Sequence, residues 1–567
     1  METTPQADWW RKSTVYQVYP KSFKDSTGSG TGDIQGLTGK LDYLQELGID
    51  IVWLQPVYVS PQNDNGYDVA DYRQIDPAFG TMEDFEELIR ELKKRGMHLM
   101  TDIVVNHSST EHPWFQEARK SKDNPYRNYY IWRDPAPDGG VPNNWQSKFG
   151  GPAWQFDEIT GQYFLTLFDK TQADLNWENE QVRQEVADLM IFWAEKGVDG
   201  FRMDVINLIS KDQSFPDDDP AAVPGDGRRF YTDGPRVHEY IKELYAKVFG
   251  PYNLVTVGEM SSTTLEHCIR YSAPEEREFS MTFNFHHLKV DYKNGQKWEL
   301  QPYDFAELKE LFTRWQTGMQ QAGGWNALFW NNHDQPRALS RFADDGKYRK
   351  ESAKMLATTL HGMQGTPYVY QGEELGMPNP DWHDISEFND IESKNMYRIL
   401  QERGLSGEQA LDIIRERSRD NSRTPMQWDA SGHAGFTSGT PWLKVDRRYK
   451  EINVQAEQID PDSIFAHYKQ LIRLRKQEPV ITDGIFKRLD EGHPQIFAYA
   501  RVGNTETLIV VSSFSGTQAG FSFADEFWSS RINSQAAELL IGNTEQTPVW
   551  SQSLEIPPYG SYMWIIR

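Results

Sequence analysis

Short apolar segments that alternate with longer segments of helical periodicity limit most strongly what this chain can fold into. Apolar residues at 34, 37, 41, 44 and 47 recur at helical spacing up to Gly48, and residues 50–57 then have the composition of a buried strand. Further helices are expected at 82–94, 181–196 and 464–476. Strands that alternate with helices in this way are expected to run parallel, because each helix serves as a crossover connection.

Eight segments have the composition of strands, and the first of them is expected over residues 15–23. Eight parallel strands with helices between them predict an α/β protein with a closed (β/α)8 TIM barrel. A doubly wound open sheet is the alternative, but no glycine-rich phosphate-binding pattern follows the first strand. The eight segments lie near residues 15, 51, 99, 200, 254, 281, 327 and 367.

Two regions depart from this alternation. Between residues 107 and 177 the chain is rich in Gly, Pro, Trp and Asp, and a connection of that length inside a compact domain predicts an inserted subdomain. After the helix at 464–476, short alternating strands separated by turns predict an antiparallel β domain. We therefore assign residues 1–106 and 178–484 to the barrel, 107–177 to the insertion and 485–567 to a C-terminal β domain.

The net charge of −24 argues against a nucleic-acid partner, since a polyanion would be repelled over most of the surface. The single cysteine, Cys268, rules out an intrachain disulfide and fits a reducing compartment. No basic segment followed by an apolar run is found at the N-terminus, and no apolar run reaches transmembrane length. We expect a soluble cytoplasmic protein with no membrane partner; the sequence leaves its oligomeric state open.

Polar side chains gather at the carboxyl ends of the expected strands, where the active site of such a barrel lies. Arg202 and Asp204 are two residues apart, so a strand places both on one face. A buried charged pair is costly unless it is mutually satisfied or used in chemistry, and a strand-end salt bridge is the simpler interpretation. The other polar residues at strand ends are Asp102, Asn106, His107, Glu259, Asn332, His333 and Asp334.

Acidic side chains that converge from separate strands favour glycoside hydrolysis. In that reaction one acid attacks or stabilises the anomeric centre and another protonates the leaving oxygen. Metal-dependent hydrolysis is the competing class, because Asp and His also bind metals. The sequence contains no HExxH motif and no cysteine cluster, and Arg202 would repel a cation beside Asp204. We therefore expect no cofactor for catalysis.

Five short motifs carry a resemblance to a known family. DIVVNH, GFRMDVIN, VGEM and NNHDQ resemble, in order, the four signature regions of the α-amylase family of glycoside hydrolases. QADLNW, at residues 172–177, resembles the fifth region of the oligo-1,6-glucosidase branch. The resemblance spans essentially the whole chain, and it implies a barrel, a small domain B after the third strand and a C-terminal β-sandwich.

The resemblance also implies roles for individual residues. Asp204 would be the nucleophile, Glu259 the general acid/base, and Asp334 would bind sugar hydroxyls and stabilise the transition state. Arg202 would keep Asp204 ionised and oriented, since a neighbouring cation lowers the pKa of a carboxyl. The implied outcome is retention of anomeric configuration through a glycosyl-enzyme intermediate. The residues that resemble hydroxyl-binding histidines of the first sugar subsite are His107 and His333.

Two further motifs imply attack at the end of a short substrate. GYDVADY places Tyr67 as a stacking platform beside Asp68, and SRTPMQW supplies Arg423. In the exo-acting enzymes that this chain resembles, the equivalents of Asp68 and Arg423 pair, hold the terminal hydroxyls of a non-reducing glucose and close the pocket. Val205, directly after the expected nucleophile, resembles the residue of enzymes that prefer linkages other than α-1,4.

A basic group near the sixth strand suggests an anionic substrate. A cluster of cations beside a sugar pocket holds a phosphate through charge-assisted hydrogen bonds and supplies a local positive field in an acidic protein. Solvated surface charge is the alternative for any one of these side chains. The group comprises His286, His287, Lys289, Lys293 and Lys297, with Arg228, Arg229 and Arg236 from a second segment that resembles phosphotrehalose-hydrolysing enzymes.

The expected activity is therefore that of an exo-acting retaining α-glucosidase that splits trehalose 6-phosphate, a small phosphorylated disaccharide, into glucose and glucose 6-phosphate. The first alternative is an oligo-1,6-glucosidase or dextran glucosidase that acts on neutral isomaltooligosaccharides. A glucosyl-shifting isomerase would use the same acids. A non-enzymatic carbohydrate-binding or transporter-associated subunit is disfavoured, since all three expected catalytic acids are present.

One glycine-rich loop bears on a structural metal ion. Residues 25–33, DSTGSGTGD, resemble the divalent-ion loop of this branch, commonly DSNGDGIGD. Thr27 and Ser29 stand where an amide and a carboxylate are usual, which leaves fewer anionic ligands. The sequence leaves a structural Ca²⁺ or Mg²⁺ and a plain glycine-rich turn equally open. The ligands of such an ion would be Asp25, Thr27, Ser29, the Thr31 carbonyl and Asp33.

Overall fold

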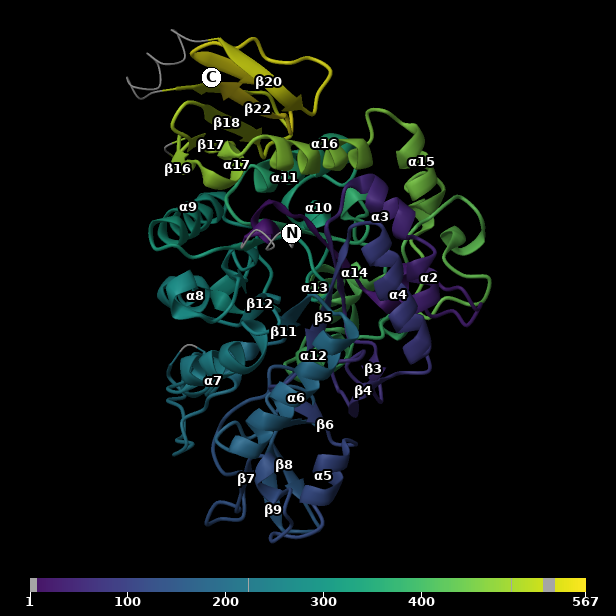
Figure 1. The fold of residues 1–567 in the computed structure, drawn as a ribbon, viewed down its shortest axis with the longest axis vertical. Helices are drawn as coiled ribbons and strands as arrows, with labels where there is room; N and C mark the ends of the chain where they lie inside the picture. Colours follow the sequence, from purple (N-terminus) through teal and green to yellow (C-terminus); the bar gives the residue numbers. More distant parts are fainter. Residues whose placement is uncertain (1–7, 223, 491, 524–535) are drawn as a thin grey trace, which may run out of the picture.

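A computed structural model of the chain describes residues 8–222, 224–490, 492–523 and 536–567 (Figure 1). Residues 1–7 lie outside these ranges. They are the first part of the N-terminal segment in which no basic stretch followed by an apolar run is found. Within them, no helix is both long and apolar enough to cross a lipid bilayer.

The centre of the molecule is a sheet of eight parallel strands in the order β13-β12-β11-β5-β2-β1-β15-β14. A parallel bridge between Thr282 of β13 and Asn326, next to β14, closes this sheet into a barrel. The expected TIM barrel is confirmed. Its strands are β1 (Val15–Val18), β2 (Ile51–Leu54), β5 (His98–Ile103), β11 (Gly200–Met203), β12 (Val255–Met260), β13 (Met281–Asn284), β14 (Ala327–Leu328) and β15 (Thr366–Tyr370).

Helices surround the barrel, and most agree with the periodicity of the sequence. α6 (Glu180–Lys196) begins at the N-cap Asn179, whose side chain accepts from the backbone N–H of Gln181, and ends at Gly197 in the left-handed conformation. α4 (Met82–Lys94) and α16 (Ile464–Gln477) also match their predictions.

Two boundaries near the N-terminus differ from the prediction. The segment expected as one strand over 15–23 is a strand only to Val18, because Pro20 starts the short helix α1 (Pro20–Phe23). The apolar pattern at 34–47 forms two helices, α2 (Ile34–Thr38) and α3 (Leu41–Leu47), which are separated at Gly39 and Lys40. Local glycine and proline chemistry overrides the apolar period at both places.

The inserted segment forms a small lobe at the lower end of Figure 1. Its three-stranded antiparallel sheet has the order β7-β9-β8, and β6 (His107–Ser109) pairs with β10 (Gln172–Asp174) where the segment leaves and rejoins the barrel. A separate apolar cluster that includes Trp145 and Trp154 fills this lobe. The strands of its sheet are β7 (Trp132–Arg133), β8 (Trp154–Asp157) and β9 (Gln162–Leu165).

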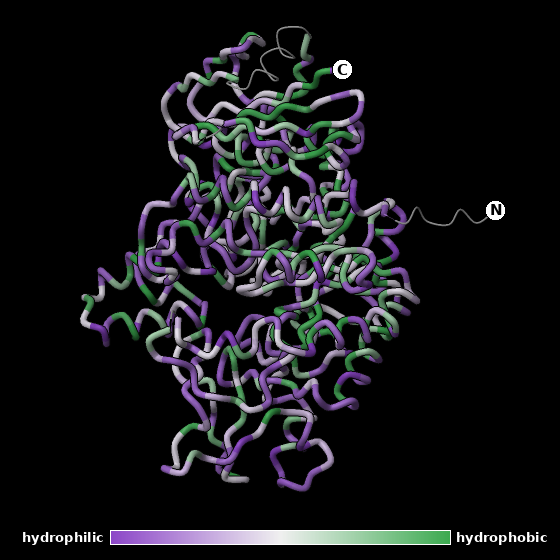
Figure 2. Tube along the Cα trace, turned by 90° about the vertical axis from the view of Figure 1, so that its left-hand side faces the viewer, coloured by the Kyte–Doolittle hydropathy of each residue, from purple (hydrophilic) through white to green (hydrophobic). Residues whose placement is uncertain are grey.

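In its described residues, the C-terminal domain, at the upper end of Figure 1, contains a five-stranded and a two-stranded antiparallel sheet. Hydrophobic residues are concentrated along its strands (Figure 2), and an apolar core lies between them. The predicted β-sandwich is confirmed. The strands are β16 (Ile485–Arg488), β17 (Ile496–Val502), β18 (Thr507–Ser513), β22 (Ser561–Ile566) and β20 (Ala537–Gly542) in one sheet, with β19 (Ala519–Ser522) and β21 (Ser553–Ile556) in the other.

Candidate active site

Three carboxylates from neighbouring strand ends share one guanidinium. Nη1 of Arg202 lies 2.7 Å from Oδ1 of Asp102 and 2.5 Å from Oδ1 of Asp204. Nη2 of the same residue lies 2.7 Å from Oε2 of Glu259. Because β5, β11 and β12 are consecutive in the barrel, their carboxyl ends bring these side chains together.

One cation cannot balance three buried carboxylates, so the group favours holding a proton. Burial raises the pKa of Glu259 to about 8, against the opposing effect of Arg202. Burial also raises the pKa values of Asp204 and Asp102, but these stay below that of Glu259. Arg202 does lower the pKa of Asp204 as expected, although burial outweighs it. The order of the three values places the proton on Glu259, because both Asp102 and Asp204 ionise at a lower pH than Glu259.

The third expected catalytic acid, Asp334, follows β14 and has a different electrostatic environment. Its Oδ2 lies 3.1 Å from Nε2 of His333, and its Oδ1 lies 2.9 Å from Nη2 of Arg423 and 3.3 Å from Nη1 of Arg419. Burial opposes ionisation of Asp334, but His333 and the two arginines outweigh burial and hold its pKa well below the usual range. Asp334 is therefore ionised at neutral pH.

The three acids open into one cavity of 250 Å³. Tyr67 lies in its wall, with its ring stacked on His333 at 5.0 Å between centroids and 4° between planes. Nε2 of His107 lies 3.2 Å from the Tyr67 carbonyl oxygen, and burial lowers the pKa of His107 to about 4, so its ring is neutral. The lining residues are Asp64, Tyr67, His107, Lys148, Phe149, Phe168, Asp204, Val205, Glu259, Ser261, Phe285, Lys297, Asp334, Gln335, Glu392 and Arg419.

The expected pair of Asp68 with Arg423 is wrong. Asp68 is fully buried and turned into its own loop, where its carboxylate accepts from Oγ of Ser60 and from the backbone N–H groups of Asn63 and Asp64. Arg423 instead binds Asp334 and the carbonyl of His333. The pair that does line the cavity is Asp64 with Arg419, whose Oδ1 and Nη2 atoms are 2.9 Å apart.

Several residues of the predicted basic group lie away from the cavity. His287 is in the core, with Nε2 2.9 Å from the Phe329 carbonyl oxygen, and Nε2 of the half-buried His286 lies 2.8 Å from the Thr263 carbonyl oxygen. Lys293 is exposed on the short turn η8 (Lys293–Gly295). Lys297 lines the cavity but forms an ion pair of 2.6 Å with Glu392.

Of the arginines in the second segment, all three have acidic partners. Arg228 pairs with Asp226, and Arg229 with Asp218 at 2.7 Å. Arg236 pairs with Glu178 and Glu239. Each of these three guanidiniums therefore already has an acidic partner in the chain.

Two lysines lack such partners. Within the described ranges, Nζ of neither Lys148 nor Lys289 makes an ion pair or a hydrogen bond with the chain. Burial, with the nearby charge of Arg228, lowers the pKa of Lys289 to about 8 and that of Lys148 to about 7. Lys148 comes from the inserted lobe and lines the cavity, and Lys289 follows β13. A pair of half-buried cations without an acid is an arrangement that an anionic group would complete.

The glycine-rich loop at 25–33 is closed by hydrogen bonds from its own surroundings. The Asp25 carboxylate accepts from the backbone of Thr27, Gly28 and Gly30 and from two hydroxyls, and these bonds outweigh burial and lower its pKa to about 2. Asp33 accepts from Ser26 and caps α2 at Gly36. In the described part of the chain no group of three His, Cys, Asp or Glu side chains is arranged to hold a metal ion. The donor set fits a metal ion poorly, and the ion stays a prediction.

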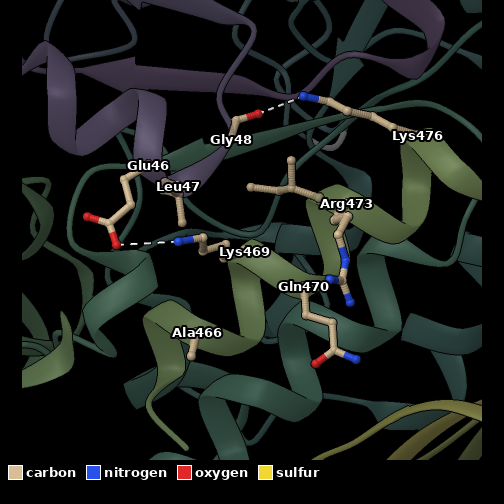
Figure 3. Close-up of a pocket in the computed structure, with 9 residues that line it drawn as sticks. Glu46, Leu47, Gly48, Ala466, Lys469, Gln470, Arg473 and Lys476 are labelled. Atoms are coloured by element: carbon tan, nitrogen blue, oxygen red, sulfur yellow. Dashed lines mark hydrogen bonds and ion pairs between the residues drawn. The ribbon is translucent and has the colours of Figure 1, made fainter. Parts of the chain in front are cut away.

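A second groove, of 440 Å³, lies between α3 and α16 (Figure 3). Glu46 pairs with Lys469 across it, and Nζ of Lys476 donates to the Gly48 carbonyl oxygen. None of the residues that line the catalytic cavity takes part in it.

The sequence interpretation missed Asp64, Lys148, Glu392 and Arg419. Asp64 and Arg419 lie four residues before Asp68 and Arg423, just before the motifs GYDVADY and SRTPMQW, so the motifs located the right loops but not the residues. Lys148 lies in an irregular segment with no periodicity, and no local pattern indicates its direction.

A retaining glycosidase uses one protonated and one ionised carboxyl. Here Glu259 and Asp204 supply them at the carboxyl ends of the barrel strands, and Arg202 contacts both. The chain is a glycoside hydrolase.

Comparison with known proteins gives the family. The model "Alpha amylase, catalytic domain" matches residues 17–484, and the chain belongs to the α-amylase family. It is 56% identical to trehalose-6-phosphate hydrolase of Bacillus subtilis over 99% of each chain, and 53% identical to oligo-1,6-glucosidase of Parageobacillus thermoglucosidasius over 94% of each. The crystal structure of Bacillus licheniformis trehalose-6-phosphate hydrolase superposes with a TM-score of 0.93 at 56% identity, covering 98% of this chain and 99% of that one.

Proposed function

We propose that this protein hydrolyses trehalose 6-phosphate to glucose and glucose 6-phosphate, with retention at the anomeric carbon. The observation that carries the proposal is the pair of lysines without acidic partners, Lys148 and Lys289, beside the cavity that holds the catalytic acids. The similarity to trehalose-6-phosphate hydrolases over nearly the full chain supports it. Oligo-1,6-glucosidases are also similar, and they supply the alternative substrate class.

The reaction follows from the protonation order of the acids. Ionised Asp204 attacks the anomeric carbon of the glucose unit while protonated Glu259 donates its proton to the glycosidic oxygen, and glucose 6-phosphate departs. Glu259, now ionised, removes a proton from water, which hydrolyses the bond between glucose and Asp204. Arg202 contacts both side chains and fixes their relative position.

The glucose unit occupies the part of the cavity bounded by Tyr67, His107 and Asp334. Ionised Asp334 accepts hydrogen bonds from sugar hydroxyls, and the face of Tyr67 packs against the ring. The Asp64–Arg419 ion pair forms the wall of this part. A wall there suits a substrate with a single non-reducing glucose, which supports exo action.

In this proposal the phosphate of the leaving sugar binds between Lys148 and Lys289. At neutral pH a phosphate carries nearly two negative charges, and it would raise the lowered pKa values of both lysines and hold them charged. Because the insertion supplies Lys148 and the barrel supplies Lys289, binding of the phosphate would join the two parts across the cavity. We also place the enzyme in the cytoplasm, because a reducing compartment fits its single cysteine, Cys268.

The experiment replaces Lys148 and Lys289 separately by methionine and compares kcat/KM on trehalose 6-phosphate and on trehalose. A charge-assisted hydrogen bond contributes about 1.5–3 kcal/mol, so each variant is expected to lose about 10- to 100-fold on the phosphorylated sugar. Activity on trehalose is expected to stay within about 2-fold of the unmodified protein. Lys293→Met, at an exposed position, is the matched control. Equal losses on the two substrates would contradict the proposal.

A further inference from the structure

A buried asparagine joins the two strand ends that carry the nucleophile and the acid/base. Asn207 lies on the short turn η3 (Ile206–Leu208), three residues after Asp204, and is fully buried. Its Oδ1 accepts from the backbone N–H of Ser261 at 2.9 Å, and its Nδ2 donates to the Ser261 carbonyl oxygen at 2.9 Å. Ser261 follows Glu259 by two residues and lines the cavity.

This side chain extends the barrel sheet beyond its backbone pairs. The register of β11 with β12 ends at Met203 opposite Gly258. A carboxamide has one donor and one acceptor edge, as a peptide group does, so Asn207 bonds to both the backbone N–H and the carbonyl oxygen of Ser261. The segment with Asp204 is thereby tied to the segment with Glu259 past the last ladder bond.

Asp233 fixes the orientation of the Asn207 amide. Oδ1 of Asp233 accepts from Nδ2 of Asn207 at 3.0 Å and from the Tyr271 hydroxyl at 2.8 Å. The backbone N–H of Asp233 donates to the Asn207 carbonyl oxygen at 2.9 Å. A carboxylate only accepts, so the amide nitrogen must face Asp233, and the donor and acceptor edges toward Ser261 are determined.

The residue between Asp204 and this bridge is held in a strained conformation. Val205 has φ 37° and ψ 37°, a left-handed conformation that is rare for a β-branched residue. In that conformation its backbone N–H donates to Oε2 of Glu259 at 3.0 Å. Strain of this kind persists only where surrounding bonds oppose its relaxation, and the Asn207–Ser261 bridge is the adjoining set of bonds.

We propose that Asn207 is a positioning residue for the proton transfer by Glu259: its amide bridge to Ser261 holds the Val205 N–H on Glu259 and the Glu259 carboxyl in line with the leaving oxygen. Asn207 is not among the residues that line the cavity. The inference concerns the acid/base step of any glucoside substrate and is independent of the phosphate.

The test uses Asn207→Asp, which keeps the shape but replaces the donor by an acceptor facing the Ser261 carbonyl and Asp233. We expect the variant to lose kcat/KM in proportion to how much the leaving group needs a proton. Phenyl α-glucoside needs protonation, and its kcat/KM should fall about 100-fold, the contribution of a positioned general acid. 2,4-Dinitrophenyl α-glucoside needs none, so its kcat/KM should fall less than about 3-fold.

A pH profile supplies a readout that a purely structural defect would not move. The Val205 N–H bond lowers the pKa of Glu259, so losing that bond raises it. Glu259 acts as the acid, so the alkaline limb of kcat/KM on phenyl α-glucoside should move to higher pH in Asn207→Asp. The matched control is Asn453→Asp, the same chemical change at the N-cap of α15 (Val454–Ile459), where an aspartate caps equally well.

Asp233→Ala provides a second variant if Asn207→Asp fails to fold, because it removes the group that orients the amide without adding a charge. It should show the same dependence on the leaving group, at about 10-fold for phenyl α-glucoside. Equal losses on both aryl glucosides in the folded variants would overturn the proposal, and so would unchanged kcat/KM values on both.

Discussion

Nη2 of Arg419 lies 2.9 Å from Oδ1 of Asp64, and Nη1 of the same guanidinium lies 3.3 Å from Oδ1 of Asp334. Arg419 therefore connects the wall of the glucose-binding part of the cavity to an acid expected to bind the sugar. Arg419 is buried, so neither contact is weakened by solvent as a surface pair would be.

Removing one member of the wall pair should impair binding of a terminal glucose. Asp64→Asn leaves Arg419 without one of its buried partners, and truncating such a pair costs about 2–5 kcal/mol. We expect kcat/KM on a disaccharide substrate to fall at least about 30-fold.

Asp68→Asn is the matched control, because in the described part of the chain the Asp68 carboxylate accepts bonds from its own loop, from Ser60, Asn63 and Asp64. It should lower the melting temperature and leave kcat/KM within about 3-fold. A large loss in Asp68→Asn together with a small loss in Asp64→Asn would restore the pairing expected from the sequence.

The pH dependence of activity should reflect the raised pKa values of the two catalytic carboxyls. Glu259 must be protonated to act, so kcat/KM on a neutral glucoside should fall as the pH rises through about 8. Asp204 must be ionised, so activity should also fall on the acid side, at a pH above the usual range of an aspartate. Glu259→Gln should abolish the alkaline limb with a loss of about 10²- to 10⁴-fold. An alkaline limb that persists in this variant would assign the proton to another group.

The buried Lys309, on a helix of the barrel, should stabilise the contact between the barrel and the C-terminal domain. Nζ of Lys309, on α9 (Phe305–Gln321), lies 2.6 Å from Oδ2 of Asp490 and also donates to the carbonyls of His493 and Ile496. Lys309→Met removes these bonds from a site that is 1% exposed. We expect the free energy of unfolding to fall by about 3 kcal/mol, measured by urea denaturation. Lys487→Met, at an exposed position of β16, should change it by less than about 0.5 kcal/mol.

The glycine-rich loop should be stable without a metal ion. The carboxylates of Asp25 and Asp33 already accept hydrogen bonds from the chain, so an ion would have to displace them. We expect the melting temperature to be the same with a chelator and with added Ca²⁺ or Mg²⁺. A chelator-induced decrease that Ca²⁺ reverses would show that the loop rearranges to bind the ion, since a ligand stabilises the state that binds it.

The barrel could be predicted from the sequence because its strands are buried on both faces and its helices on one. A strand buried on both faces is continuously apolar, as at residues 50–57, whereas a helix buried on one face has apolar residues at helical spacing, as in α4. The contact of Arg202 with Asp204 could be predicted for the same reason, because extended chain places residues two apart on one side, and Asp204 directly follows β11. The contact of Arg202 with Glu259 could be predicted because β11 and β12 are neighbours in the barrel.

Side chains on loops could not be placed this way. Asp64 and Asp68 lie in one loop, and only the path of its turn decides which carboxylate faces the cavity and which faces the backbone. The side chain of His287 could bind a phosphate, but it points into the core. Lys148 lines the cavity but comes from an insertion without periodicity. Loop direction depends on long-range packing, which local patterns do not encode.

The substrate class is decided by kcat/KM of the purified protein on trehalose 6-phosphate, trehalose and isomaltose, measured at one pH and ionic strength. Lys148 and Lys289 engage only the phosphorylated sugar, so we expect kcat/KM on trehalose 6-phosphate to exceed the other two values by at least about 100-fold. A value on isomaltose equal to or above that on trehalose 6-phosphate would contradict the proposed function and make the protein an oligo-1,6-glucosidase.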